Sequence, residues 1–230
     1  MIKPLFLRRL AITGFTLLVF FPALFAQNPQ LHTRSGSRFP TVIFTSVLWA
    51  ADPSYYSIAI DSTGTATYQS APDSIGKTGV PYALEFQVSD RTRRVTFNVA
   101  RQLDYFGDKA QQSVTSAQTS SVRTLAYHDS TIRHQITYSS SSDSEIDELT
   151  SVFEEISVTL EFGRRLSYFH QHDSGRLNGE LDRLQASTER RTARELQAIA
   201  PVLRSIASDD RLENGSRHKA EALLAPPTRP

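Results

Sequence analysis

The sequence predicts an α+β protein: an antiparallel sheet from two hairpin-helix units, with helices on one face, followed by a C-terminal helical extension. Twice along the chain, alternating β-branched and aromatic runs precede a segment with apolar residues at helical spacing. The last part of the chain keeps helical spacing only. Because helices that follow antiparallel hairpins pack on one face of the sheet, we expect a two-layer sandwich.

The N-terminus has the features of a secretory signal peptide. Arg8 and Arg9 precede an apolar run over residues 10–25, and small and polar residues follow from Ala26 onward. This order predicts export and removal of residues 1–26. An uncleaved membrane anchor is the alternative, because the apolar run approaches the ~20 residues that span a bilayer. Contact with a membrane is expected only through that segment.

The composition removes several kinds of chemistry. The 230 residues include no cysteine, which excludes disulfides, thiolate metal sites and a cysteine nucleophile. The 25 Lys and Arg residues nearly balance the 24 Asp and Glu residues, so no nucleic-acid partner is predicted. Residues 27–40 are polar and lack apolar periodicity, which predicts a disordered leader.

Strands are predicted in the middle of the chain by alternating patterns. Residues 41–49 form a β-branched and aromatic run. A hairpin follows over residues 55–68, where turn formers that include a glycine join two alternating halves. Residues 82–88 alternate as a further strand, and a second hairpin joins residues 122–127 to residues 132–138.

Two helices are predicted to follow these strands. The first is capped by Ser89 or Asp90 and runs to residue 105. The second has apolar residues at three- and four-residue steps, and Ser142 with Glu145 has the spacing of a capping box at its start. At 1.5 Å per residue the second helix is about 40 Å long, which is enough to cross a whole sheet.

The two hairpin-helix units resemble copies of one unit. Residues 101–106 and 164–169 carry the related phrases RQLDYF and RRLSYF near the ends of the two predicted helices. Coincidence between two amphipathic helix ends is the alternative to duplication. Both units lie within residues 41–172, the predicted sandwich domain, and the Ser-, Thr- and Gln-rich residues 111–121 are predicted to be a linker between them.

Beyond the sandwich, residues 173–225 are predicted to form the helical extension. Within it, residues 198–224 resemble one HEAT-type repeat. A single repeat cannot bury its own apolar face, so it is expected to pack on the sandwich or on a partner. Residues 226–230 form a proline-containing tail.

Catalytic motifs are sparse in this sequence. His170, His172 and Asp173 are the densest cluster of metal-ligand types, but residues two apart on a helix point to different faces. Residues 128–130 (HDS) include the residue types of a hydrolase triad, but neighbours in a turn cannot adopt its geometry. The sequence therefore predicts no catalytic residue, metal or cofactor, and it favours a protein that is not an enzyme.

Tyrosines on the predicted hairpins are the candidate binding residues. Together they would form an aromatic face on the sheet, although strand alternation sends about half of such side chains toward the core. The candidates are Tyr55, Tyr56, Tyr68, Tyr127 and Tyr138.

Four phrases between residues 46 and 224 carry a resemblance to known sequences: YSIAIDSTGTATYQS, YALEFQVS, TLAYHDS and EISVTLEFGRRLSY. They resemble a bacterial exported-protein family that contains a domain of unknown function. Some members share the first hairpin-helix unit with wider domains of unknown function, whose hairpin phrase includes a Gly and a Cys that this chain lacks, so only residues 55–68 match that phrase. The resemblance implies hairpin-helix units with a C-terminal helical segment, and it implies no activity.

Together these features predict a periplasmic or secreted protein that binds another envelope component, either a protein or a ligand. An envelope hydrolase or metal-dependent enzyme, with histidines and carboxylates brought together by the fold, is the first alternative. A protein inhibitor is the second alternative, because an exposed sheet can block an enzyme.

Overall fold

The computed structural model describes residues 39–49, 51–71, 81–115 and 121–225 of the chain. All of them belong to one compact unit that begins at Gly36. The predicted signal segment, nearly all of the predicted leader, and the C-terminal tail lie outside the described residues. Among the described residues, no helix combines the length and the apolar character needed to cross a membrane.

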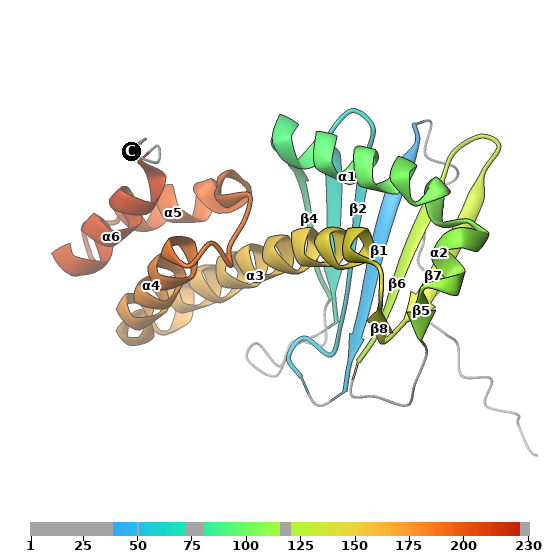
Figure 1. The fold of residues 1–230 in the computed structure, drawn as a ribbon. Helices are drawn as coiled ribbons and strands as arrows, with labels where there is room; N and C mark the ends of the chain where they lie inside the picture. The colour runs from blue at the N-terminus through green and yellow to red at the C-terminus, as the bar shows by residue number, and fades with distance from the viewer. Residues whose placement is uncertain (1–38, 50, 72–80, 116–120, 226–230) are drawn as a thin grey trace, which may run out of the picture. The chain divides into compact units, whose positions relative to one another are not determined.

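Six strands form one antiparallel sheet in the order β4-β3-β2-β1-β6-β7 (Figure 1). Their bounds are Thr41–Leu48 (β1), Tyr55–Asp61 (β2), Thr65–Ser70 (β3), Tyr82–Gln87 (β4), Ser121–His128 (β6) and Arg133–Tyr138 (β7). The first strand is central, because Phe44 pairs with Ile58 of β2 on one side and with Leu125 of β6 on the other. The strands and both hairpins predicted from alternation are confirmed.

Two helices cover one face of this sheet. They are α1 (Asp90–Gln102) and the first half of α3 (Ser144–His172), as Figure 1 shows. Phe44 of β1 stacks on Phe153 of α3, with ring centroids 5.2 Å apart and planes 8° from parallel. Both side chains are fully buried. The predicted α+β fold with helices on one face is therefore confirmed.

The first helix begins where the sequence predicts and ends earlier. Ser89 is the N-cap, and its hydroxyl accepts a hydrogen bond from the Thr92 N–H at 3.2 Å. The helix ends at Gln102 rather than at residue 105. The chain then forms a short 3₁₀ turn, Asp104–Phe106, whose three residues have φ of 48°, 52° and 69°.

The two related phrases, RQLDYF and RRLSYF, differ in structure. Residues 101–106 cross the end of α1 and enter the left-handed turn. Residues 164–169 lie inside α3, which continues as an unbroken helix to His172. The conformations of the two phrases therefore do not support duplication.

The start of the predicted linker has regular structure. Residues 111–121 overlap α2 (Asp108–Gln112) and a short strand β5 (Val114–Thr115). The strand pairs with β8 (Ser140–Ser141), just before α3. Residues 116–120 lie outside the described residues. No local pattern indicates β5, because the strand with which it pairs is distant along the chain.

The cap of α3 differs from the predicted capping box. Asp143 is the N-cap, and its carboxylate accepts a hydrogen bond from the Glu145 N–H at 3.0 Å. Ser142 is held elsewhere, because its N–H and its hydroxyl both donate to the Ser113 carbonyl, at 2.9 and 3.2 Å. The prediction that Ser142 caps this helix is therefore wrong by one residue.

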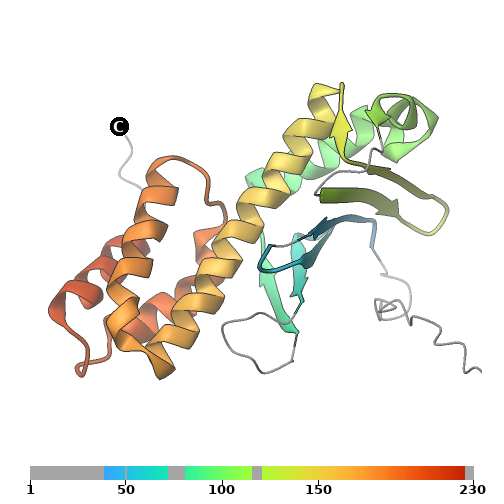
Figure 2. The ribbon, with the colours of Figure 1, turned by 90° about the horizontal axis from the view of Figure 1, so that it is seen from below.

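The C-terminal helices gather beside the second half of α3, and α4, η2 and α5 pack directly on it (Figure 2). They are α4 (Ser174–Glu189), η2 (Leu196–Ile199), α5 (Ala200–Ala207) and α6 (Asn214–Leu224). At Gly163 the approach is so close that a Cβ atom would lie 2.3 Å from Ile199 Cγ2. The two helices of the HEAT-like segment, α5 and α6, pack on each other, and α6 also packs on α4.

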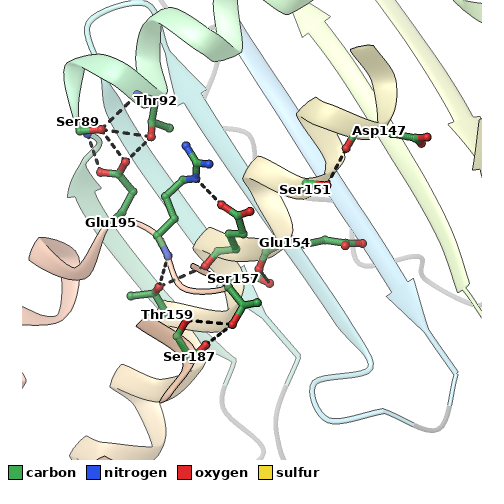
Figure 3. Close-up of polar contacts among 12 residues, drawn as sticks. Ser89, Thr92, Asp147, Ser151, Glu154, Ser157, Thr159, Ser187 and Glu195 are labelled. Carbon is green, nitrogen blue, oxygen red and sulfur yellow. Dashed lines mark hydrogen bonds and ion pairs between the residues drawn. The ribbon is translucent and has the colours of Figure 1, made fainter. Parts of the chain in front are cut away.

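Polar contacts join the segment before η2 to the middle of α3 (Figure 3). The Arg194 guanidinium is 2.7 Å from Glu155 Oε2, and the Arg194 N–H donates to Thr159 Oγ1 at 2.9 Å. At the end of α4, Ser187 and Thr192 share a hydroxyl hydrogen bond of 2.7 Å. The contacts of Arg194 therefore hold the connection between α4 and η2 against the middle of α3.

Candidate functional site

A cleft with a volume of about 600 Å³ lies between α3, α4 and the connection from β1 to β2. The wall from α3 consists of residues three and four apart, which share one face of a helix. This wall contains Glu154, Ser157, Val158, Glu161, Phe162 and Arg165. The volume falls in the usual range for sites that bind small molecules.

The wall from α4 is basic. Arg183, Ser187 and Arg190 have i, i+4 and i+7 spacing, so all three face the cleft from the same side of α4. The Glu180 carboxylate holds two guanidiniums, with Arg165 Nε at 2.6 Å and Arg183 Nη1 at 2.7 Å. Since Glu180 is buried, these ion pairs fix the arginines in position.

The connection from β1 to β2 forms the third wall. Leu48, Asp52, Pro53 and Tyr56 line the cleft from this side, and the Asp52–Pro53 peptide is cis. The Asp52 carboxylate is 3.9 Å from the Arg164 guanidinium. This wall adds apolar surface beside one carboxylate.

Glu161 is the buried carboxyl group of the cleft. Its Oε1 accepts a hydrogen bond from the Tyr68 hydroxyl at 2.6 Å, and its Oε2 accepts one from Arg164 Nε at 2.7 Å. Burial raises the pKa of Glu161 above its ordinary value, although the bond from Tyr68 opposes that shift. Burial and the nearby Glu161 charge also raise the pKa of Tyr82 to about 12.

The five candidate tyrosines do not share an exposed face. Tyr56, Tyr68, Tyr127 and Tyr138 all point toward the helices and are buried, none more than 5% exposed. Tyr55 follows the alternation of β2 and points to the opposite face of the sheet. Only Tyr56 lines the cleft, and Tyr68 contributes by holding Glu161.

The histidines near the end of α3 do not gather into a metal site. His170 Nε2 is 2.9 Å from Asp209 Oδ2, and the His172 ring lies 4.9 Å from that of Tyr168. Within the described ranges, no group of three or more His, Asp and Glu side chains could hold a metal ion. None of the described histidines lines the cleft.

The serine hydroxyl groups in the cleft form hydrogen bonds within the protein. Ser157 Oγ donates to the Glu154 carbonyl at 2.8 Å, and Ser187 Oγ bonds to Thr192. Neither serine contacts a histidine among the described residues, so a serine nucleophile with its base is not assembled here. The fixed features of the cleft are charge, shape and apolar surface.

The sequence contains a weak signal for this site. Arg183 lies beside the leucines of the apolar stripe of α4 and Arg190 follows that stripe, at a spacing of seven residues that places both on one face. A glutamate at position 161 interrupts the apolar pattern of α3 in a similar way. Neither pattern shows by itself that these side chains face a cleft, because the opposite wall comes from the connection between β1 and β2.

The fold and the cleft define an α+β protein with a charged cleft at the junction of its sheet and helices. No known protein family matches the chain. A search among curated proteins also gives no match.

Proposed function

We propose that this protein is exported and binds a ligand in the cleft between α3, α4 and the β1–β2 connection, without catalysing a reaction. The observation that carries the proposal is the α4 wall. There, Arg183 of α4 and Arg165 of α3, both held by the buried Glu180 carboxylate, meet apolar side chains inside a cavity of small-molecule size. Fixed charges next to apolar surface supply orientation and affinity before a ligand arrives.

Export rests on the sequence of the first 26 residues. Fractionation of cells that produce the full chain, followed by N-terminal sequencing, tests this part. We expect the mature protein outside the cytoplasm with Gln27 as its first residue. Retention of the intact N-terminus in the membrane fraction would support the anchor instead, and a cytoplasmic protein would contradict export.

Ligand binding is tested on the mature protein incubated with a small-molecule extract of the cell envelope. After gel filtration and denaturation, mass spectrometry identifies what the protein retained. Arg190→Trp fills the mouth of the cleft, and Arg94→Trp places the same substitution at an exposed position on α1. We expect a compound retained by the wild type and by Arg94→Trp and lost from Arg190→Trp. Equal retention by both variants, or none by the wild type, contradicts the proposal.

A second candidate, an envelope hydrolase, is favoured by Glu161. A buried carboxyl group with a raised pKa is suited to general acid catalysis. We rank it second because both Glu161 oxygens already accept hydrogen bonds, from Tyr68 and Arg164. A panel of chromogenic esters and glycosides tests it: an enzyme of this kind would turn over at least one substrate, and Glu161→Gln would lower kcat about 100-fold or more.

A further inference from the structure

We propose that the ligand of the cleft is a small amphipathic anion, with its charged head on the arginines of α4 and its apolar part along Val158 and Phe162. This inference rests on the proposed binding function and specifies the chemistry of the ligand. Three features of the cleft support it: the distribution of charge, the place of the apolar surface, and the size of the cavity.

Positive charge is in excess on the α4 side. Arg165 and Arg183 share the single carboxylate of Glu180, at 2.6 and 2.7 Å. Arg190 lines the same cleft and forms no ion pair with any residue in the described part of the chain. With Arg165 of α3 included, three guanidiniums therefore meet the one carboxylate of Glu180 here, which favours an anionic group.

The carboxylates that line the cleft pair with arginines outside the cavity. Glu154 pairs with Arg123 of β6 at 2.8 Å, whereas Glu161 and Asp52 share Arg164 of α3, which lies 3.9 Å from the Asp52 carboxylate. Those two arginines do not line the cavity. A ligand cation would compete with arginines already in place, whereas a ligand anion would find unpaired donors on α4.

Apolar surface lies directly beside the arginines. The Arg165 guanidinium is stacked over the Phe162 ring, 4.7 Å from its centroid. Val158, one turn earlier on α3, and Leu48 at the end of β1 continue this surface along the cleft. A ligand with an anionic head and a short apolar part would satisfy both regions at once.

The chain contains a built-in reporter for the test. Trp49 is its one tryptophan, follows Leu48 directly, and is 59% exposed. Octanoate, octyl phosphate, octanol, octylammonium and inorganic phosphate form a matched set of probes. Each is titrated into the mature protein below its micelle concentration, with Trp49 fluorescence and calorimetry as readouts.

We expect saturable one-to-one binding of octanoate or octyl phosphate, and the tighter of the two identifies the head group. Octanol, octylammonium and inorganic phosphate should each bind at least tenfold more weakly, because each lacks one of the two features. Arg190→Ala should weaken the binding of the anion about tenfold, the loss of one charge-assisted contact. Arg94→Ala makes the same charge change on α1 and should leave the affinity unchanged.

Equal binding of octanol and octanoate would overturn the inference, because apolar contact alone would then explain the affinity. Equal losses in Arg190→Ala and Arg94→Ala would also overturn it, because net charge rather than the cleft would be responsible. If the envelope extract yields a retained compound while neither anionic probe binds, the ligand class is wrong and the binding function stands. If the extract also yields nothing, the binding function fails as well.

Discussion

The Glu195 carboxylate binds the N-cap residue of α1, Ser89, although Glu195 lies 106 residues further along the chain. Its carboxylate accepts hydrogen bonds from the Ser89 N–H at 2.7 Å and from the Ser89 hydroxyl at 2.8 Å (Figure 3). Thr92 and Gln197 donate to the same carboxylate. Glu195 itself is buried and has a φ of 65°. The segment before η2 is thereby joined to the N-terminus of α1.

Removing this carboxylate should destabilise the whole compact unit. Glu195→Ala leaves the buried donors of Ser89 and Thr92 without their acceptor, and we expect a loss of about 3 kcal/mol in the free energy of unfolding. Glu195→Gln keeps one acceptor oxygen and should lose less. Urea unfolding measures both, with the exposed Glu189→Ala as a control that should change stability by less than about 0.5 kcal/mol. A Glu195→Ala variant as stable as the control would show that the contact contributes nothing.

Gly163→Ala tests the close approach of α3 to η2. Helix propensity alone predicts that alanine stabilises an interior helical position by about 1 kcal/mol. The new Cβ would lie 2.3 Å from Ile199 Cγ2, so we expect instead a loss of about 1–3 kcal/mol in the free energy of unfolding.

The double variant Gly163→Ala/Ile199→Ala separates crowding from other effects at this position. Because Ile199→Ala removes the atom that the new methyl group meets, the two changes should together cost less than the sum of their separate effects. Strict additivity in urea unfolding would show that the two residues do not crowd each other.

The start of α3 distinguishes the observed cap from the cap predicted by sequence. Asp143→Ala should lower the free energy of unfolding by about 1 kcal/mol, because the Glu145 N–H loses its acceptor. Ser142→Ala removes only an exposed bond to the Ser113 carbonyl and should cost less than about 0.5 kcal/mol. Thermal unfolding of the two variants provides the comparison, and the reverse order would favour the capping box.

The hairpin turn between β6 and β7 should make stability depend on acid pH. Hydrogen bonds from the backbone N–H groups of Ile132 and Thr131 hold the pKa of Asp129 at about 2. The pKa is lower in the folded than in the unfolded state, so the contribution is complete above about pH 4 and is lost as the pH falls toward 2. Between these values, the wild type should lose more stability than Asp129→Asn.

Nuclear magnetic resonance titration of the Asp129 carboxyl carbon measures the pKa directly, and acid unfolding measures its effect. Asp61→Asn is a matched control in the other hairpin, whose carboxylate also accepts hydrogen bonds from backbone N–H groups, those of Thr63 and Thr65. Asp61→Asn removes a carboxylate without touching the hydrogen bonds from Thr131 and Ile132 to Asp129, so the Asp129 carboxyl should titrate in this variant as it does in the wild type. An Asp129 carboxyl that titrates near pH 4 would contradict the prediction.

Local patterns predicted those features whose causes are local. Alternation identified the strands. The cap of α1 was predicted to be Ser89 or Asp90, and it is Ser89, whose hydroxyl accepts the Thr92 N–H three residues later. Turn formers located the hairpin that contains Asp129. In each case the residues that stabilise the feature lie within a few positions of one another, so their order in the chain is sufficient.

Predictions failed where a distant residue competes. Ser142 has the spacing of a capping box, but its bonds to Ser113 displace the cap to Asp143. Four of the candidate tyrosines are core residues, because each lies on the face of its strand that the helices cover. Alternation shows which side chains share a face of a strand, but only the packing of α1 and α3 shows which face the helices cover.

The sequence by itself determined the α+β class, the strands and the approximate helices, because hydrophobic periodicity and turn chemistry act over short distances along the chain. The tertiary structure alone decided the cleft, the paired arginines on Glu180 and the carboxylate of Glu195 on α1. Each of these needs side chains from two or more segments, and ion pairs and buried hydrogen bonds depend on positions in space. The spacing of Arg183 and Arg190 was visible in the sequence, but only the packing of α4 beside α3 makes it one wall of a site.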